Sequence, residues 1–190
     1  MNIEGIYTIG YGERTFEQFS SLLENYQIDY LIDVRSKPFS KFKPEFSKAP
    51  LEYQLNLRKI RYVFMGDLLG GQPDDDSCYT EGKVDYKKIQ EKDFYQQGIK
   101  RLKTAFDKNC RVVLMCSEMK PQDCHRSKLI GETLTNDLGI PMFHIDEDGE
   151  IKSQEKVVSL LTNGQYEIFN NFFTSRKSYK KQDPQNDESY

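Results

Sequence analysis

The sequence predicts a single α/β domain of three layers, with about five mostly parallel strands and helices on both faces of the sheet. Short apolar runs without polar alternation indicate strands that are buried on both faces. Amphipathic stretches of helical length separate these runs. The first two runs and the helical pattern between them fit within about 30 residues, the length of a βαβ unit, which makes these two strands parallel.

The strands are expected where the apolar runs lie. Their ranges are 6–9, 30–34, 61–64, 111–115 and 142–145. The first run contains Thr8 and is followed by Gly10, Tyr11 and Gly12, a turn whose glycines allow backbone conformations closed to other residues. Only the G-x-G part of a dinucleotide fingerprint is present, so the motif is a weak indication of a nucleotide. We expect these four residues to contact a ligand.

The helices are expected between and after the strands. Thr15 and Gln18 match a capping box at the start of the first helix. Asp85 and Asp93 are interpreted as successive N-caps. Further helices are expected at 49–59, at 124–138, at 153–161 and around Phe169, Phe172 and Phe173. The glycine-containing, acidic stretch 66–82 is expected to be irregular.

The end of the chain has a different composition. From about residue 175 it is polar and rich in Lys, Gln, Asp and Ser, which predicts disorder. We therefore expect one domain over residues 1–174 and a disordered polar tail over 175–190.

The composition excludes several classes of protein. The net charge of −3 argues against broad, non-specific phosphate binding, although it allows a local basic pocket. No apolar run approaches membrane-spanning length and the N-terminus lacks a signal pattern, so we expect a cytoplasmic protein without a membrane partner. The four cysteines are too few and too irregularly spaced for a disulfide framework, which leaves thiols, metal ligands or a redox pair.

Reactive residue types concentrate between positions 112 and 127. The apolar run ends at Cys116, a polar loop follows, and a helix is expected to restart with Asp123 as its N-cap. In parallel α/β proteins, a loop that joins a strand end to a helix N-terminus is a common place for chemistry. The candidate catalytic residues of this stretch are Cys116, Glu118, Cys124, His125 and Arg126.

A second group of candidates follows the second strand. Asp33 interrupts a buried run and needs a partner such as Arg35, so the pair belongs either to the site or to a structural cap. The loop after it interleaves Lys and Phe, which suits a phosphate-bearing or aromatic ligand and equally a solvated loop pinned to the core by its Phe side chains. Lys37 in this loop, with Gly70 and Gly71, is a candidate ligand contact. We expect Asp33 and Arg35 to share a cleft with the loop after Cys116, because the carboxyl ends of parallel strands meet at one edge.

Four motifs stand out along the chain. They are Tyr7-Thr8-Ile9-Gly10-Tyr11-Gly12, Leu31-Ile32-Asp33-Val34-Arg35, Leu68-Leu69-Gly70-Gly71, and Cys116-Ser117-Glu118 with Cys124-His125-Arg126-Ser127. Together they resemble the domain-of-unknown-function family 488, over roughly residues 5 to 145. The resemblance implies an α/β domain with these motifs near one site, and it supplies no settled reaction.

The chain also has a weaker similarity to rhodaneses and cysteine phosphatases. In those enzymes a Cys at the end of a strand is cradled by backbone N–H groups before a helix. Here seven residues separate Cys116 from Cys124 and the loop lacks glycine, which departs from the short catalytic loop of those enzymes.

Three mechanisms remain open for these residues. In the first, which we expect, an enzyme acts on a phosphate-bearing or sulfur-bearing anionic substrate, with Cys124 as a low-pKa nucleophile and Cys116 as its resolving partner. In the second, the Cys, Glu and His side chains of the stretch bind Zn or Fe, although adjacent Cys-His pairs rarely share one ion and no metal ligand is assigned. In the third, Arg35 and Arg126 bind a nucleotide or nucleic-acid phosphate without reaction. The sequence specifies neither a cofactor nor an oligomeric state.

Overall fold

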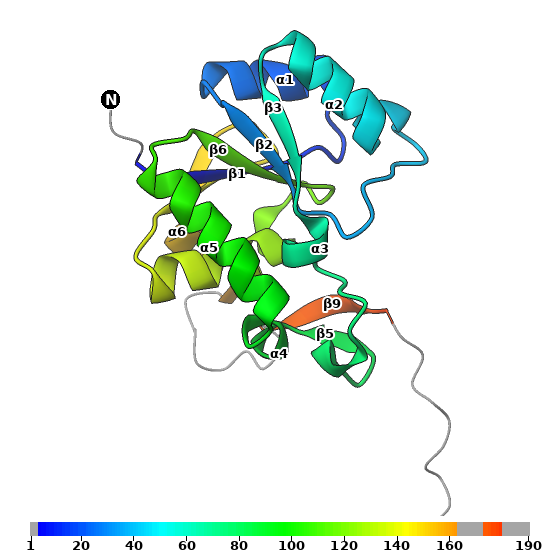
Figure 1. Cartoon of the computed structure of the whole chain (residues 1–190), viewed down its shortest axis with the longest axis vertical. Helices are drawn as coiled ribbons and strands as arrows, with labels where there is room; N and C mark the ends of the chain where they lie inside the picture. The colour runs from blue at the N-terminus through cyan, green and yellow to red at the C-terminus, as the bar shows by residue number, and fades with distance from the viewer. Residues whose placement is uncertain (1–3, 163–172, 180–190) are drawn as a thin grey trace, which may run out of the picture.

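The computed structural model describes residues 4–162 and 173–179. A six-stranded sheet forms its centre, with the strands in the order β3-β2-β6-β1-β7-β8 (Figure 1). Their bounds are Arg61–Phe64 for β3, Tyr30–Asp33 for β2, Val112–Cys116 for β6, Ile6–Gly10 for β1, Met142–Ile145 for β7 and Ile151–Ser153 for β8. The first five strands are parallel, and β8 runs antiparallel to β7. The predicted α/β class is confirmed, with β8 as an addition at the edge.

Helices cover both faces of this sheet (Figure 1). On one face lie α1 (Phe16–Asn25) and α2 (Lys48–Leu57); on the other lie α5 (Asp93–Asp107), a helix over 125–137 and α6 (Gln154–Thr162). The side chains of β6 alternate between the two layers. Val113 and Met115 pack with the first face, and Val112 and Leu114 with the second. This burial on both sides is what an uninterrupted apolar run predicts.

A second, three-stranded antiparallel sheet contains β4 (Tyr79–Thr80), β5 (Lys83–Asp85) and β9 (Thr174–Ser178), in the order β4-β5-β9. Strand β9 shows that the predicted disorder of 175–190 is wrong for 175–178, which pair with β5. Backbone hydrogen bonds at both ends stabilise the pairing, because the Tyr86 N–H donates to the Phe173 carbonyl and the Tyr179 N–H to the Gly82 carbonyl. Residues 163–172, which include most of the predicted last helix, and residues 180–190 lie outside the described ranges.

Several helix boundaries differ from the prediction by a residue or a turn. The capping box of Thr15 and Gln18 is present at α1, and Asp85 caps α4 (Tyr86–Gln90) as predicted. Asp93 is the first residue of α5 instead of its N-cap. The stretch 66–82 is more regular than expected, because it contains α3 (Gly66–Leu69), a 3-10 turn at Asp76–Cys78 and β4.

The carboxyl ends of the central strands meet at one edge of the sheet. Gly10 of β1 lies beside Cys116 of β6, and Asp33 of β2 lies beside Met115 of β6. The chain leaves β1 toward β2 on one side and leaves β6 toward β7 on the other, which opens a crevice between the two connections. Within the described ranges, no helix has both the length and the apolar character needed to cross a membrane.

Candidate active site

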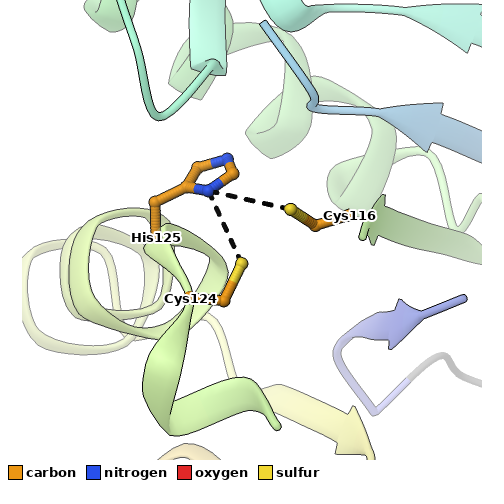
Figure 2. Close-up of side chains that lie close together, drawn as sticks. All are labelled: Cys116, Cys124 and His125. Atoms are coloured by element: carbon orange, nitrogen blue, oxygen red, sulfur yellow. Dashed lines mark hydrogen bonds between the residues drawn. The ribbon is translucent and has the colours of Figure 1, made fainter. Parts of the chain in front are cut away.

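Two thiols and an imidazole converge at the end of β6 (Figure 2). The Nδ1 atom of His125 lies 3.5 Å from the Cys124 Sγ and 4.0 Å from the Cys116 Sγ. Cys116 ends the strand, whereas Cys124 and His125 stand at the start of the 125–137 helix. All three side chains are buried. The strand-to-helix connection therefore brings together residues that are separated by a loop of seven.

The orientation of His125 is set by a backbone carbonyl. Its Nε2 lies 3.1 Å from the carbonyl oxygen of Val34, which can only accept a hydrogen bond, so Nε2 carries a proton. In the neutral ring, Nδ1 then presents a lone pair to the two thiols. Gly71 closes the other side, because a Cβ at this position would lie 2.8 Å from Nδ1. A side chain at residue 71 would displace the imidazole.

The predicted cap of the following helix is wrong. Asp123 belongs to a 3-10 turn over Pro121–Asp123, and Cys124, with φ −117° and ψ 149°, is the extended residue that precedes the helix. The Cys124 carbonyl accepts hydrogen bonds from the N–H groups of Ser127 and Lys128. Cys124 therefore takes the capping position that we expected for Asp123, and its sulfur interacts with the Arg126 N–H of the first turn.

Arg126 brings a fully buried positive charge to the same place. Its Nη2 donates to the Glu118 carbonyl at 2.6 Å and its Nη1 to the Thr8 hydroxyl at 3.2 Å. Among the described residues, no carboxylate lies within ion-pair distance of this guanidinium. A buried charge favours an anion beside it, and the charge of Arg126 acts to lower the pKa of the neighbouring Cys124 thiol.

The two thiols are coupled and their pKa values move apart. Burial by itself would raise the pKa of Cys124, but the hydrogen bond from the Cys116 thiol, the charge of Arg126 and the Arg126 backbone N–H outweigh it and lower that pKa to about 6. The same hydrogen bond, together with burial, raises the pKa of Cys116 to about 12. Of the two thiols, Cys124 is therefore the one that loses its proton more easily.

A chain of buried hydrogen bonds holds Arg126 from behind. The Thr8 hydroxyl accepts from Arg126 and lies 2.8 Å from Nδ1 of His144. Nε2 of His144 lies 2.8 Å from the side-chain oxygen Oε1 of Gln154. The side-chain Nε2 of Gln154 donates to the Glu132 carboxylate at 2.8 Å. Burial and the charge of Arg126 lower the pKa of His144 to about 3, so the ring is neutral and links the two polar side chains. The donors of Gln154, His144 and Thr8 thus face acceptors, whereas the buried Nε–H of Arg126 has no hydrogen-bond partner among the described residues.

Asp33 and Arg35 form a bidentate ion pair beside the thiols. The Arg35 Nε and Nη2 donate to the two Asp33 oxygens at 2.9 and 2.6 Å, and the Tyr62 hydroxyl donates to the same carboxylate at 2.7 Å. Burial works against the charge of Arg35, but its hydrogen bonds to Asp33 and the Asp33 charge raise its pKa above the ordinary value. Asp33 is therefore fully engaged with partners.

A cleft of about 240 Å³ gives access to this centre. Seven of the predicted site residues line it: Arg35, Lys37, Gly71, Cys116, Glu118, Cys124 and His125. The other predicted site residues do not line the cleft, and they contact the residues that do or pack close to them. Gly10 packs against the Glu118 backbone, where a Cβ would lie 1.9 Å from the carbonyl oxygen. The Thr8 hydroxyl accepts from Arg126, and the Tyr11 hydroxyl accepts from Arg35. The Gly12 N–H donates to the Ser117 carbonyl. Gly70 packs against Ser36.

The small sheet supplies a wall of the cleft that the sequence did not indicate. The lining residues that we missed include Tyr86, Ser175, Arg176, Lys177 and Tyr179. Arg176 lies 3.3 Å from the Asp123 carboxylate and 3.8 Å from that of Glu118. These ion pairs join β9 to the loop between the two cysteines. Strand β9 has no apolar run, which is why its polar composition indicated disorder instead.

Comparison with known protein families identifies the chain. The family model described as "Domain of unknown function DUF488" matches residues 15–132, well over half of the sequence. The matched range contains Cys116, Cys124 and His125. The match confirms the family resemblance that the sequence motifs indicated. Searches of curated proteins and of solved structures found no match. The chain therefore belongs to the DUF488 family, a domain family of unknown function.

Proposed function

We propose that this chain is a thiol-dependent enzyme that acts on a small anionic substrate, with Cys124 as its nucleophile. The observation that carries the proposal is the position of the Cys124 sulfur. It faces the cleft at the start of a helix, beside the buried guanidinium of Arg126, for which the described residues offer no carboxylate. A helix N-terminus and a neighbouring cation are the two features that stabilise a thiolate in cysteine enzymes.

Cys124, Cys116 and His125 have separate roles in the proposed reaction. The Cys124 thiolate forms a bond to an electrophilic sulfur atom, and the leaving group departs with the electron pair. Cys116 keeps its proton until Nδ1 of His125, 4.0 Å away, accepts it. The Cys116 thiolate then attacks the Cys124 sulfur of a disulfide adduct, which forms an internal disulfide and releases the bound group. Two equivalents of a small-molecule thiol regenerate the dithiol by successive exchange and leave as their own disulfide.

The charges around the cleft favour an anionic substrate. Arg35 and Arg176 are occupied by carboxylates. Lys37 and Lys177 also line the cleft, and neither forms an ion pair within the part of the chain that the structure describes. Two free ammonium groups beside a thiolate suit a phosphate-bearing or sulfur-bearing anion.

The proposal is tested with a small aromatic disulfide, 4,4′-dithiodipyridine, whose released thione is followed by absorbance. Wild type is expected to release two equivalents rapidly at the site, because attack by Cys124 is followed by attack of Cys116. Cys116→Ser should release one equivalent and retain a mixed disulfide on Cys124. Cys124→Ser should lose the rapid phase, with peptide mass spectrometry separating slower reaction at Cys78 and Cys110. Equal rates in wild type and Cys124→Ser would reject the nucleophile.

A metal centre is the second candidate, and the spacing of the three ligand atoms favours it. In a tetrahedral zinc site, bonds of about 2.0–2.3 Å place neighbouring N and S ligands roughly 3.5 Å apart. The distances from Nδ1 to the two sulfurs are 3.5 and 4.0 Å, and the second ring nitrogen of His125 is held by a carbonyl, as in many metal-bound histidines. Cys116, Cys124 and His125 would then hold the ion, with a fourth position toward the cleft.

Metal analysis of protein purified without chelator decides between the two candidates. A metal centre predicts about one equivalent of zinc or iron that is lost in Cys116→Ser and in Cys124→Ser. The thiol enzyme predicts less than a tenth of an equivalent and full reaction with the disulfide. Metal-free protein that also fails to react would favour a binding module.

A further inference from the structure

Residues 36–47 form most of the segment that joins β2 to α2, and part of this loop is anchored to the core. We call it the 36–47 loop. Its Phe46 ring is buried, stacks on Tyr11 with centroids 4.4 Å apart, and meets the edge of Phe19 at 5.2 Å. The Ser40 N–H donates to the Ser47 hydroxyl at 3.1 Å, and the backbone is further held by a 3-10 turn at Pro44–Phe46. These contacts fix the C-terminal part of the loop to the core.

The other two aromatic rings of this loop point into solvent. Phe39 is 71% exposed and Phe42 is 91% exposed. Only Phe46 pins the loop to the core, so the sequence-based alternative in which the Phe side chains serve as anchors holds for one ring of three. Exposed large apolar side chains on an ordered loop mark a binding surface when they occur together.

Positive charge accompanies these rings. The Lys41 ammonium lies 5.9 Å from the centre of the Phe42 ring. Lys37 lies on the same loop and lines the cleft with the two thiols. Neither lysine has an ion-pair partner among the described residues. In a chain with a net charge of −3, this loop is a local basic and aromatic surface that leads into the cleft.

We propose that the 36–47 loop binds single-stranded nucleic acid beside the cleft, which it reaches through Lys37. Unpaired bases stack on Phe39 and Phe42, while Lys37 and Lys41 contact phosphates. A duplex hides the base faces that exposed phenyl rings would stack on. An anionic membrane is a poorer fit, because its broad negative surface would repel the acidic protein beyond this small loop. The proposal goes beyond the proposed function: it adds a polymer-binding surface beside the small-anion cleft and does not depend on the thiol chemistry.

Fluorescence anisotropy with a 5′-labelled twelve-nucleotide thymidine strand, and with its uridine RNA counterpart, tests this binding. Phe39→Ala/Phe42→Ala is expected to raise the Kd at least roughly tenfold, because stacking on an aromatic side chain contributes about 1–3 kcal/mol per base. The matched control is Leu138→Ala/Leu160→Ala, which removes exposed apolar side chains elsewhere and should leave the Kd unchanged. Lys37→Ala/Lys41→Ala should lower the slope of log Kd against log salt by about 1.4, at about 0.7 for each phosphate contact.

Each outcome supports or rejects the loop as the binding surface. No binding by wild type at low salt would overturn the proposal, as would an equal Kd for wild type and the double Phe variant. Binding to phosphatidylserine vesicles that depends on the Phe side chains, without strand binding, would assign the loop to a membrane instead. Cys124→Ser separates this proposal from the enzyme: it should abolish the rapid thiol reaction and retain strand binding.

Discussion

At the scale of single residues, Arg126 determines the chemistry of the site. It is fully buried, and its hydrogen bonds go to a hydroxyl and to backbone carbonyls. Neutral acceptors position a guanidinium without cancelling its charge. The charge therefore acts on the neighbouring groups that can ionise, and it helps to lower the pKa of the Cys124 thiol.

The Thr8 hydroxyl is predicted to support this arrangement. In Thr8→Val, Arg126 loses an acceptor and the buried Nδ1 of His144 loses a donor. The free energy of unfolding should fall by about 1–3 kcal/mol, the usual cost of an unpaired buried polar group. Thr8→Ser keeps the hydroxyl and is the matched control in urea unfolding. If the Val and Ser variants were equally stable, the hydroxyl would have no such role.

The sequence predicted the reactive residues better than the network behind them. Cys116, Cys124, His125 and Arg126 stand within one short stretch, so local spacing was enough to place them together. Thr8 and His144 are 136 positions apart and meet only because β1 pairs with β7. No local pattern contains that pairing. Asp123 had the residue type of an N-cap, but the turn that begins at Pro121 takes it out of position.

At the scale of elements, β9 changes the interpretation of the chain end. The strand pairs with β5, and its Ser175 hydroxyl accepts from the Val84 N–H at 2.9 Å. Arg176 then joins it to both acidic residues of the cysteine loop. Periodicity methods detect apolar faces, and this strand of mostly polar residues has none. A polar strand of this kind is recognisable only when its partner strand is known.

Truncation after Thr174 is expected to destabilise the protein. The variant loses the β9 ladder and the ion pairs of Arg176. The melting temperature should fall by roughly 2–4 °C for each kcal/mol of stability lost. The truncation should also widen the cleft and accelerate alkylation of Cys124, because β9 residues form one wall of the cleft. Truncation after Tyr179 keeps the strand and serves as the control. An unchanged melting temperature and reactivity in the shorter variant would show that β9 is dispensable.

At the scale of the whole molecule, the sheet order explains why the site lies where it does. The apolar runs predicted five parallel strands. The strands β3, β2, β6, β1 and β7 of the central sheet are parallel as predicted. The site then follows from the parallel arrangement, because the ends of β1, β2 and β6 meet at one edge. The three-stranded sheet could not be predicted in this way, since two of its strands have only two and three residues.

Cys124 is predicted to be a thiolate at neutral pH. The most direct test is the rate of iodoacetamide alkylation of Cys124 against pH, followed by peptide mass spectrometry on chelator-treated protein. A lowered pKa means that the thiolate, and with it the rate, reaches its plateau at lower pH. The rate in wild type should rise through an inflection near pH 6.

Two substitutions of Arg126 show whether its charge is the cause. Arg126→Met removes the charge at similar volume and should move the inflection toward the ordinary value of about 8.5 for a free thiol. Arg126→Lys keeps a positive charge and should leave the inflection clearly lower than in the Met variant. An inflection at or above 8.5 in wild type, unchanged in both variants, would contradict the account.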